Sequence, residues 1–327
     1  MKAVLPKEVK DVISKLTKAG FEAYVVGGCV RDLFLKKEPV DWDVATSATP
    51  EEIQKIFPNN FYENQFFTVT ILTGSKNEQV KEIEVTTYRS DDKYADRRRP
   101  EEVKYAETLK EDLSRRDFTV NAMALREVDN REELIDPYDG QADLKERVIR
   151  AVGDAEKRFE EDALRMMRAA RLATTLEFTV EDKTHKAIQK NAELLKEISQ
   201  ERIRDELVKI VMAERAQSGI ELLRELKLLP YIVPELEEGY GVTQNKHHIY
   251  TVWEHNMHTL QYAADQGWEL EVRLASLLHD VAKPRVKKGE GKDATFYNHE
   301  IVGAKMAAKI LERLKFSRKE IEYVAKL

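Results

Sequence analysis

The sequence predicts an α+β protein in which a small unit of mixed strands and helices precedes a longer helical part. Three observations support this prediction. Strand-like apolar runs end near residue 125, and the pattern after Asp136-Pro137 is helical throughout. A chain of 327 residues is also too long for one ordinary core. We therefore expect three domains, over residues 1–145, 146–235 and 236–327.

The first domain is expected to begin with a helix and then to alternate short strands with helices. Apolar residues at helical spacing predict a helix over residues 6–19, and a short apolar strand over 23–26 leads directly into Gly27-Gly28. A helical turn over 30–35 and a second strand over 40–45 follow. The acids of that second strand alternate with apolar residues, which is typical of a strand with one polar face.

The rest of this domain contains a clear helix start and two further strands. Thr49 followed by Pro50 and two glutamates is typical of a capped helix N-terminus. Residues 67–72 and 83–87 are rich in β-forming side chains. The segment 90–100 is polar and charged and includes three consecutive arginines, so we expect a mobile loop there.

The remaining chain is expected to be helical. Apolar periodicity predicts four helices, over residues 159–172, 184–197, 202–212 and 220–226. A last helical region begins near Tyr250 and contains most of the seven histidines.

Composition limits the class of protein. Hydrophobic residues make up 42% of the chain and charged residues 35%, with a net charge of −6, so a nucleic-acid surface would have to be a local basic stripe. The single cysteine, Cys29, excludes an intrachain disulfide. The N-terminus lacks the apolar core of a signal peptide, and no apolar run reaches transmembrane length. We expect a soluble, cytoplasmic protein without a membrane partner.

Two acids on the second strand are the first candidates for chemistry. Asp41 and Asp43 are two residues apart, which on a strand places both carboxylates on one face. A divalent cation such as Mg²⁺ relieves their repulsion and also binds substrate phosphates, as nucleotidyl transfer requires. Taken alone, the spacing is more typical of a solvated strand in an acidic protein. Glu84, on the strand over 83–87, is the candidate for a third carboxylate, or else an outward-facing strand acid.

The preceding glycines strengthen the catalytic interpretation. Gly28 lies between a strand and a helix, where a triphosphate can approach the backbone closely. Arg31 follows in the first helical turn, from which it could reach a phosphate. These residues predict a nucleotide-binding turn beside the two acids.

A second candidate site lies at the start of a downstream helix. Asp162 and Arg165 are three residues apart and share a helix face. A carboxylate that accepts from an amino group, beside a guanidinium that donates to a ring nitrogen, fits the edges of cytosine and adenine and rejects guanine and uracil. Arg168 and Arg171 continue this face and could hold a triphosphate or an RNA backbone. The alternative is an amphipathic helix with solvated arginines.

Several segments together resemble the class II tRNA nucleotidyltransferase and bacterial poly(A) polymerase family. In chain order they are VVGGCVRDLFL (25–35), DWDVATSATPEE (41–52), RRDFTVNAMAL (115–125), DPYDGQADL (136–144), EDALRMMRAARLA (161–173) and SQERIRDELVKI (199–210). The resemblance implies a polymerase-β-like head, with Asp41 and Asp43 as metal ligands, followed by neck and body helices. It further implies that Arg116 contacts nucleotide, that Asp117 helps to hold the site, and that residues 89–100 form the family's mobile loop.

The histidines resemble a second known motif. His255, the pair His279-Asp280, and His299 follow the order of ligands in HD phosphohydrolase domains. Adjacent His and Asp can share a metal that positions a water molecule. The last aspartate of that pattern is missing from this chain, so a structural helical domain with surface histidines is the alternative.

The expected activity is template-independent addition of CCA to the 3′ end of tRNA, with Mg²⁺ as cofactor and CTP and ATP as substrates. Poly(A) addition and A-only addition are alternatives within the same family. An HD phosphohydrolase and a non-catalytic RNA-binding module are alternatives from other classes. tRNA and the two nucleotides are the expected partners, DNA is not expected, and the oligomeric state is not indicated.

Overall fold

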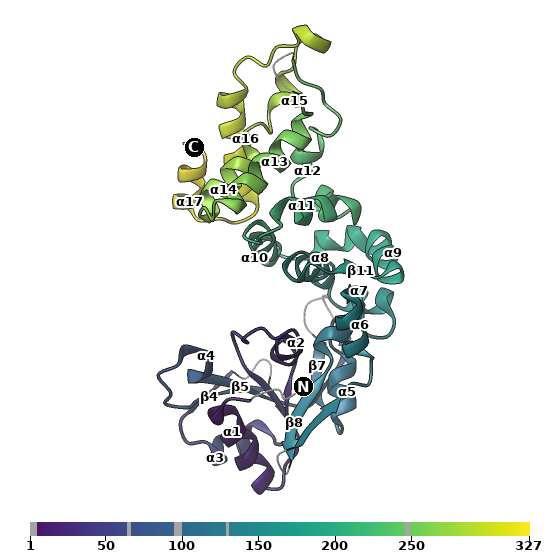
Figure 1. The fold of residues 1–327 in the computed structure, drawn as a ribbon, viewed down its shortest axis with the longest axis vertical. Coiled ribbons are helices and arrows are strands. Elements are labelled where there is room, and N and C mark those ends of the chain that lie inside the picture. Colours follow the sequence, from purple (N-terminus) through teal and green to yellow (C-terminus); the bar gives the residue numbers. More distant parts are fainter. Residues whose placement is uncertain (1–4, 64–66, 95–99, 129–130, 246–248) are drawn as a thin grey trace. The chain divides into compact units, whose positions relative to one another are not determined.

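The computed structural model describes residues 5–63, 67–94, 100–128, 131–245 and 249–327. The chain separates into two compact units, Met1–Glu161 and Asp162–Leu327 (Figure 1). The mixed α+β class is confirmed, because strands gather in the first unit and helices dominate the second. The division into three domains stays a prediction.

The first unit contains mixed elements. In order they are α1 (Lys7–Lys18), β1 (Ala23–Val26), α2 (Gly28–Phe34), β2 (Asp43–Thr46), α3 (Pro50–Ile56), β3 (Asn60–Glu63), β4 (Thr68–Leu72), α4 (Glu78–Lys81), β5 (Glu82–Thr87), β6 (Arg89–Tyr94), β7 (Pro100–Tyr105), α5 (Leu109–Ser114), the 3₁₀ turn η1 (Thr119–Asn121), β8 (Ala124–Val128), β9 (Arg131–Ile135), α6 (Gly140–Glu146), β10 (Val148–Ile149) and α7 (Ala155–Glu161).

A mixed sheet forms the centre of this unit. Its order over the described residues is β3-β4-β5-β2-β1-β8-β9, with β2 and β5 parallel and the other neighbours antiparallel. Val25, Val44 and Val85 are buried at its centre, and α1 and α3 pack on each other and on the sheet (Figure 1). Thr49 forms the predicted helix cap, a full capping box with Glu52.

Two predictions about this unit are wrong in detail. Strand β2 begins at Asp43 rather than at residue 40, and Asp41 lies exposed in the bend before it. The Trp42 carbonyl accepts from Glu84 N (3.1 Å), so the ladder begins there. The loop expected over 90–100 is largely a hairpin, because β6 pairs with β7 from Arg89↔Tyr105 to Tyr94↔Pro100. Residues 95–99, with the three arginines, lie outside the described residues.

The second unit is helical. Its elements are α8 (Leu164–Leu176), β11 (Thr179–Val180), α9 (Asp182–Asn191), η2 (Ala192–Glu197), α10 (Gln200–Val211), α11 (Ala216–Glu225), η3 (Leu229–Tyr231), α12 (Pro234–Glu237), α13 (Val252–Asp265), α14 (Leu270–Leu278), α15 (Lys283–Val286), η4 (Gly291–Asp293), α16 (His299–Arg313) and α17 (Arg318–Val324).

Close packing joins α8, α10 and α11. A Cβ atom on Gly219 would lie 2.5 Å from Ile210 Cγ2 and 2.9 Å from Thr174 Cγ2, so α11 needs glycine to approach both neighbours. The helix predicted over 159–172 is interrupted at Asp162-Ala163, where the Asp162 carboxylate accepts from Leu164 N (3.0 Å). This side-chain bond replaces a helical one and starts α8 afresh.

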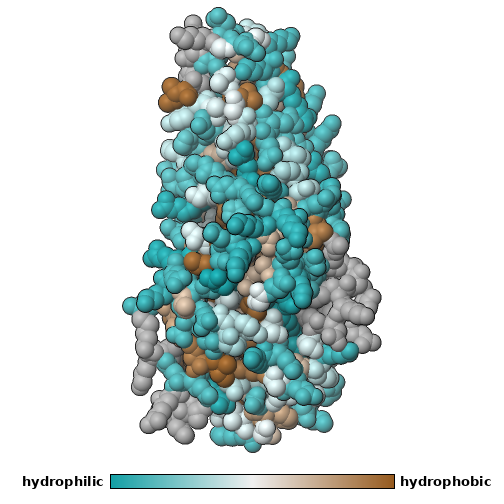
Figure 2. All heavy atoms as spheres, turned by 90° about the vertical axis from the view of Figure 1, so that its right-hand side faces the viewer, coloured by the Kyte–Doolittle hydropathy of each residue, from teal (hydrophilic) through white to brown (hydrophobic). Residues whose placement is uncertain are grey.

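The surface is predominantly polar. On the face shown in Figure 2, hydrophilic side chains cover most of the area and hydrophobic atoms form small separate groups. Among the described residues, every helix is too short or too polar to cross a bilayer.

Candidate active site

The pairing of β2 with β5 brings two of the predicted acids together. Asp43 and Glu84 are direct partners in the parallel register. Asp41 precedes β2 by two residues and is exposed. The three carboxylates expected to form the catalytic group therefore gather at one end of two central strands.

The electrostatics of Asp43 show that this group carries concentrated negative charge. Burial raises the pKa of Asp43 to about 6; the Arg116 guanidinium opposes this shift, whereas the carboxylates of Asp41 and Glu84 add to it. Oxygen ligands that repel one another in this way suit a hard divalent cation. The donor set thus fits Mg²⁺, with Asp41 and Asp43 as the residues that would hold it.

A glycine turn faces the same carboxylate. Gly27 has φ +81°, and a Cβ atom there would lie 2.8 Å from Arg116 Nη1 and 3.5 Å from Asp43 Oδ2. A side chain at this position would displace the Arg116 guanidinium and crowd the acid, and the positive φ itself favours glycine. The sequence predicted Gly28 as the nucleotide-binding glycine. Gly28 begins α2 and adjoins Arg31, since a Cβ atom on Gly28 would lie 3.5 Å from Nη2 of that arginine.

Arg31 is held by a chain of polar side chains that the sequence did not reveal. Its Nη1 donates to Asn121 Oδ1 (2.8 Å), and its Nε donates to Asp32 Oδ1 (2.9 Å). Asn121 Nδ2 in turn donates to Asp117 Oδ1 (3.2 Å). Asp117 thus acts on Arg31 through Asn121. The sequence signal for Asn121 was its place four residues after Asp117, in the same 115–125 segment.

In the second unit, the predicted base-reading acid is fixed by a residue from another helix. Asp162 Oδ2 accepts from Arg202 Nη2 (2.7 Å), while its Oδ1 caps α8. Arg165 is only 9% exposed, and Arg171 Nε donates to Glu206 Oε2 at 2.6 Å. Arg168 lies on α8 and is half-buried. Arg202 and Glu206 belong to the 199–210 segment but were not predicted as site residues.

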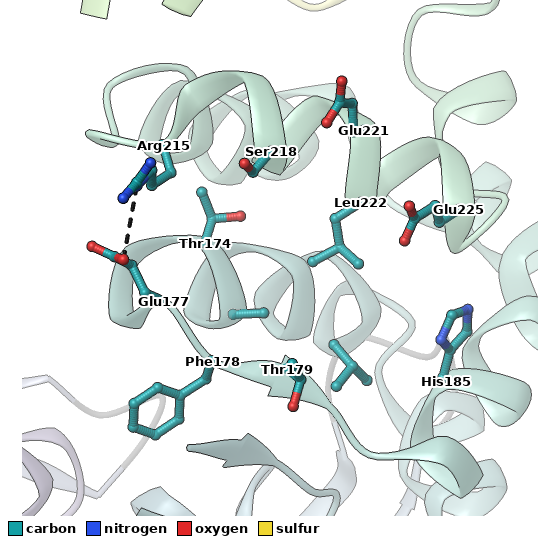
Figure 3. A pocket seen from close by; sticks show the side chains of 12 residues that line it. Thr174, Glu177, Phe178, Thr179, His185, Arg215, Ser218, Glu221, Leu222 and Glu225 are labelled. Atoms are coloured by element: carbon teal, nitrogen blue, oxygen red, sulfur yellow. Dashed lines mark ion pairs between the residues drawn. The ribbon is translucent and has the colours of Figure 1, made fainter. Parts of the chain in front are cut away.

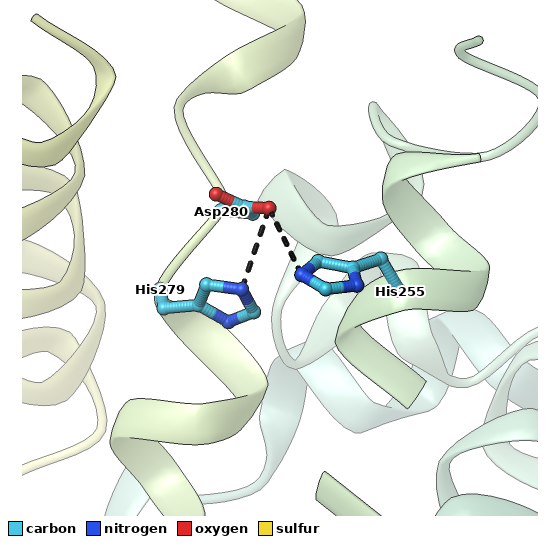
Figure 4. A group of neighbouring side chains, drawn as sticks. All are labelled: His255, His279 and Asp280. Atoms are coloured by element: carbon cyan, nitrogen blue, oxygen red, sulfur yellow. Dashed lines mark ion pairs between the residues drawn. The ribbon is translucent and has the colours of Figure 1, made fainter. Parts of the chain in front are cut away.

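The structure brings the candidate histidines and Asp280 close together. His255 from α13 and His279 after α14 both point toward Asp280 (Figure 4), with Nε2–Oδ2 distances of 3.6 and 3.3 Å. Their potential ligand atoms lie within 4.8 Å of one another. His299 Nε2 lies 3.7 Å from Asp280 Oδ1. This geometry fits a divalent metal site of nitrogen and oxygen ligands.

Asp280 is held as an anion. Burial alone would raise its pKa, but His279 and Lys283 outweigh burial and lower the pKa of Asp280 to about 2. For His279 the signs are reversed. Burial lowers its pKa, but the neighbouring Asp280 has the larger effect, so the pKa of His279 is raised above its ordinary value. Lys283 Nζ lies 2.7 Å from Asp280 Oδ2 and donates to Gln244 Oε1. An ionised acid beside imidazoles is ready to accept a cation without first losing a proton.

A separate cavity of about 460 Å³ lies between α8, β11, α9 and α11 (Figure 3). Glu177 and Arg215, which both line it, form an ion pair with 3.7 Å between their charged atoms. None of the residues predicted from the sequence lines this cavity.

Comparison with protein families gives three matches along the chain. Residues 23–150 match the poly A polymerase head domain, 177–239 the probable RNA and SrmB-binding site of polymerase A, and 252–327 the HD domain. The first match contains the carboxylate group, and the third contains the histidine cluster.

Curated relatives are CCA-adding enzymes. The protein from Lactobacillus delbrueckii subsp. bulgaricus is 50% identical over 216 residues, which are 65% of this chain and 52% of that protein. The protein from Lactococcus lactis subsp. cremoris is 45% identical over 238 residues, 72% of this chain and 58% of that protein. The chain therefore spans little more than half the length of these relatives.

Solved structures extend the similarity over nearly the whole chain. The Bacillus stearothermophilus CCA-adding enzyme in complex with CTP is 32% identical, with a TM-score of 0.72, over 98% of this chain and 68% of that one. A tRNA nucleotidyltransferase complexed with a primer tRNA and an incoming ATP analog is 28% identical, with a TM-score of 0.63, over 82% of this chain and 74% of that one.

Proposed function

The chain belongs to the class II tRNA nucleotidyltransferase and bacterial poly(A) polymerase family, and on this premise we propose that it adds CCA to the 3′ end of tRNA from CTP and ATP. The observation that carries the proposal is the direct pairing of Asp43 with Glu84 beside the Gly27 turn. This arrangement provides a carboxylate pair, an open backbone turn and a guanidinium at one place, as nucleotidyl transfer needs.

In the proposed reaction, the 3′ hydroxyl of the RNA attacks the α-phosphorus of the nucleotide in line, and pyrophosphate leaves. Asp41 and Asp43 would hold Mg²⁺, which supplies electrostatic stabilisation of the attacking and leaving oxygens. Arg31 and Arg116 donate hydrogen bonds to phosphate oxygens. The carboxylate of Glu84 adds negative charge beside Asp43, which favours binding of the cation. The Gly27 turn leaves room for the triphosphate next to Asp43.

Base choice is assigned to Asp162 and Arg165. The carboxylate accepts from the amino group of cytosine or adenine, and the guanidinium donates to the neighbouring ring nitrogen. Arg202 supports this role because its hydrogen bond to Asp162 fixes the direction of the carboxylate. Arg168 and Arg171, on the same helix α8, are the candidates for holding phosphate groups or an RNA backbone. Poly(A) addition and A-only addition would use the same residues, so only the products separate these activities.

Incubation with tRNA lacking its 3′ end, with each nucleotide alone and in combination, tests the proposed function. CTP alone should extend the RNA by about two residues, and CTP with ATP should add one more. A long product from ATP alone would identify a poly(A) polymerase, and addition only to tRNA already ending in CC would identify an A-adding enzyme. Absence of any extension would reject the proposal.

The segment around Arg97 to Pro100, most of which lies outside the described residues, is expected to matter more for the terminal A than for the two Cs. One pocket must accept a pyrimidine and then a larger purine, so an element has to move between these states. Deletion of residues 92–98 should therefore leave tRNA ending in CC, with little A added. A product ladder on a sequencing gel measures this, and a deletion variant that completes CCA at the wild-type rate would show that the segment is a passive connector.

The histidine cluster supports a second metal site, with phosphohydrolase activity as its candidate function. We expect the purified protein to bind Mn²⁺ at this site, and His255→Ala with Asp280→Asn to abolish that binding. Isothermal titration in an Asp41→Ala, Asp43→Ala background separates this site from the first. His185→Ala serves as the control, since that histidine lies on α9, in the lining of the cavity described above. Unchanged titration in the double variant would exclude the site.

The proposal also retains two further predictions. The division at residues 145 and 235 separates a catalytic head, a helical neck and body, and an HD-like region. A cytoplasmic location follows from the proposed substrates, because tRNA and nucleoside triphosphates are found together there.

A further inference from the structure

A buried carboxylate outside the predicted site holds two arginines of the 115–125 segment. Asp112 lies on α5 and is 1% exposed. Its Oδ1 accepts from Arg115 Nε (3.0 Å) and Nη2 (2.8 Å), and its Oδ2 lies 3.4 Å from Arg116 Nη2. A carboxylate removed from water in this way is stable only because these cations compensate its charge.

The same carboxylate is also anchored by the backbone of β6. Arg89 N, the first amide of β6, donates to Asp112 Oδ1 at 3.3 Å. Thr108 caps α5 through its hydroxyl, which accepts from Glu111 N. Asp112 is therefore fixed both by its own helix and by the base of the β6–β7 hairpin, and it offers its second oxygen in a fixed direction toward Arg116.

Arg116 extends from this anchor into the catalytic group. Its Nη1 lies against Gly27, on the side of that turn that also faces Asp43 Oδ2. Its Nε is buried and has no hydrogen-bond partner among the described residues. One guanidinium thus reaches from a buried acid, through Nη2, to the turn where the triphosphate is proposed to bind, through Nη1.

Arginine side chains lose considerable rotational freedom when they are fixed, so an unanchored Arg116 would bind phosphate less favourably. The carboxylates of Asp112 and Asp43 both attract the Arg116 guanidinium, because Asp43 also lies near it. Without Asp112, the guanidinium would be free to turn fully toward Asp43. A fixed partner behind the arginine keeps it available for the nucleotide.

We propose that Asp112 is a positioning residue of the nucleotidyl-transfer site, which binds Nη2 of Arg116 and so holds Nη1 beside Gly27 for the incoming triphosphate. This inference rests on the proposed function. It adds to that function a residue that touches neither the nucleotide nor the acids but determines how one guanidinium meets the nucleotide.

The test compares Asp112→Asn with Asp143→Asn. Asp143 is the matched control, because it is also buried in the first unit and also holds an arginine, Arg150, together with the hydroxyl of Thr119. Asp112→Asn should raise KM for CTP about tenfold, equivalent to about 1.4 kcal/mol of lost binding. KM for tRNA should stay unchanged, and Asp143→Asn should change neither KM. Partial unfolding would lower kcat by reducing the active fraction but would not raise KM.

A double-substitution cycle identifies the route of the effect. In an Arg116→Ala background, Asp112→Asn should raise KM for CTP less than twofold further, because Asp112 acts through that arginine. A wild-type KM in folded Asp112→Asn, or a full tenfold rise on top of Arg116→Ala, would overturn the inference while leaving the proposed function intact. Lack of nucleotide addition by the wild-type protein would instead reject the proposed function itself.

If Asp112→Asn does not fold, the wild-type protein still decides the matter. Nitrogen-15 NMR of the guanidinium groups, assigned with the Arg116→Ala variant, reports rotation about the Nε–Cζ bond of Arg116. Restricted rotation without nucleotide supports an anchored side chain. Free rotation in the absence of CTP would contradict the role of Asp112.

Discussion

Asp43→Asn should abolish nucleotide addition and yet leave the protein at least as stable as the wild type at pH 7.5. The amide lacks the charge needed to hold Mg²⁺, so kcat should fall by at least about a thousandfold. Burial disfavours the charge of Asp43 and raises its pKa to about 6. An acid whose pKa is raised in the folded state loses native stability as the pH rises from its ordinary pKa of 3.8 to the folded value of about 6. An uncharged asparagine does not have this loss. Labelled-CTP incorporation and thermal unfolding of the same preparation measure both effects.

Glu82→Gln is the control for this experiment, because Glu82 is an exposed acid on β5 two residues from Glu84. It should retain near-normal activity. Asp41→Ala should lose activity as Asp43→Asn does. Substantial turnover by either aspartate variant would refute the assignment of these acids as metal ligands, whatever the stability result.

The activity of the wild-type protein should fall below about pH 6 when Mg²⁺ is scarce. Protonation of Asp43, with its pKa near 6, removes a ligand, and protons compete with the cation for the same oxygen. Higher Mg²⁺ concentration should therefore move the midpoint to lower pH. Single-turnover rates between pH 5 and pH 8 at two Mg²⁺ concentrations would show the shift. A midpoint independent of Mg²⁺ would indicate that a different group titrates.

Local sequence signals predicted the elements that a short run of consecutive residues identifies. Strand β1 coincides with the predicted residues 23–26, because four consecutive apolar residues are buried at the sheet centre. Helix α3 begins where Thr49, Pro50 and Glu52 indicated, since the capping box is made within four residues. The β6–β7 hairpin was missed because its hydrogen bonds join two polar segments whose composition favours loops.

The candidate site divides in the same way. Asp41 and Asp43 were predicted as site residues from their two-residue spacing, and Gly28 from its position between a strand and a helix. The partnership of Asp43 with Glu84 depends on which strands pair, and no local pattern contains that choice. Asn121 and Arg202 lie in segments that the sequence singled out, and Asp112 lies three residues before one of them, but the sequence could not show which side chains these residues contact.

Asp162→Ala should relax base choice more than it weakens nucleotide binding. Removal of the carboxylate removes the acceptor for the amino group of cytosine and adenine and also the penalty that guanine and uracil meet there. Misincorporation of U and G relative to C should rise between about tenfold and a hundredfold, which corresponds to the cost of about 1–3 kcal/mol for one buried polar group left unpaired. KM for CTP should rise less, because other groups hold the triphosphate. Extension of tRNA with each nucleotide separately measures the four rates.

The selectivity ratio is the informative quantity, because Asp162 also caps α8 and binds Arg202. Loss of a cap costs about 1 kcal/mol and lowers the folded fraction, but it lowers the rates for all four nucleotides equally. Asp205→Ala on α10, an exposed acid paired with Arg204, is the control and should keep wild-type selectivity. Arg202→Ala should relax selectivity partly, since it leaves the carboxylate in place but unfixed. Wild-type discrimination against U and G in Asp162→Ala would mean that the base edge is read by other residues.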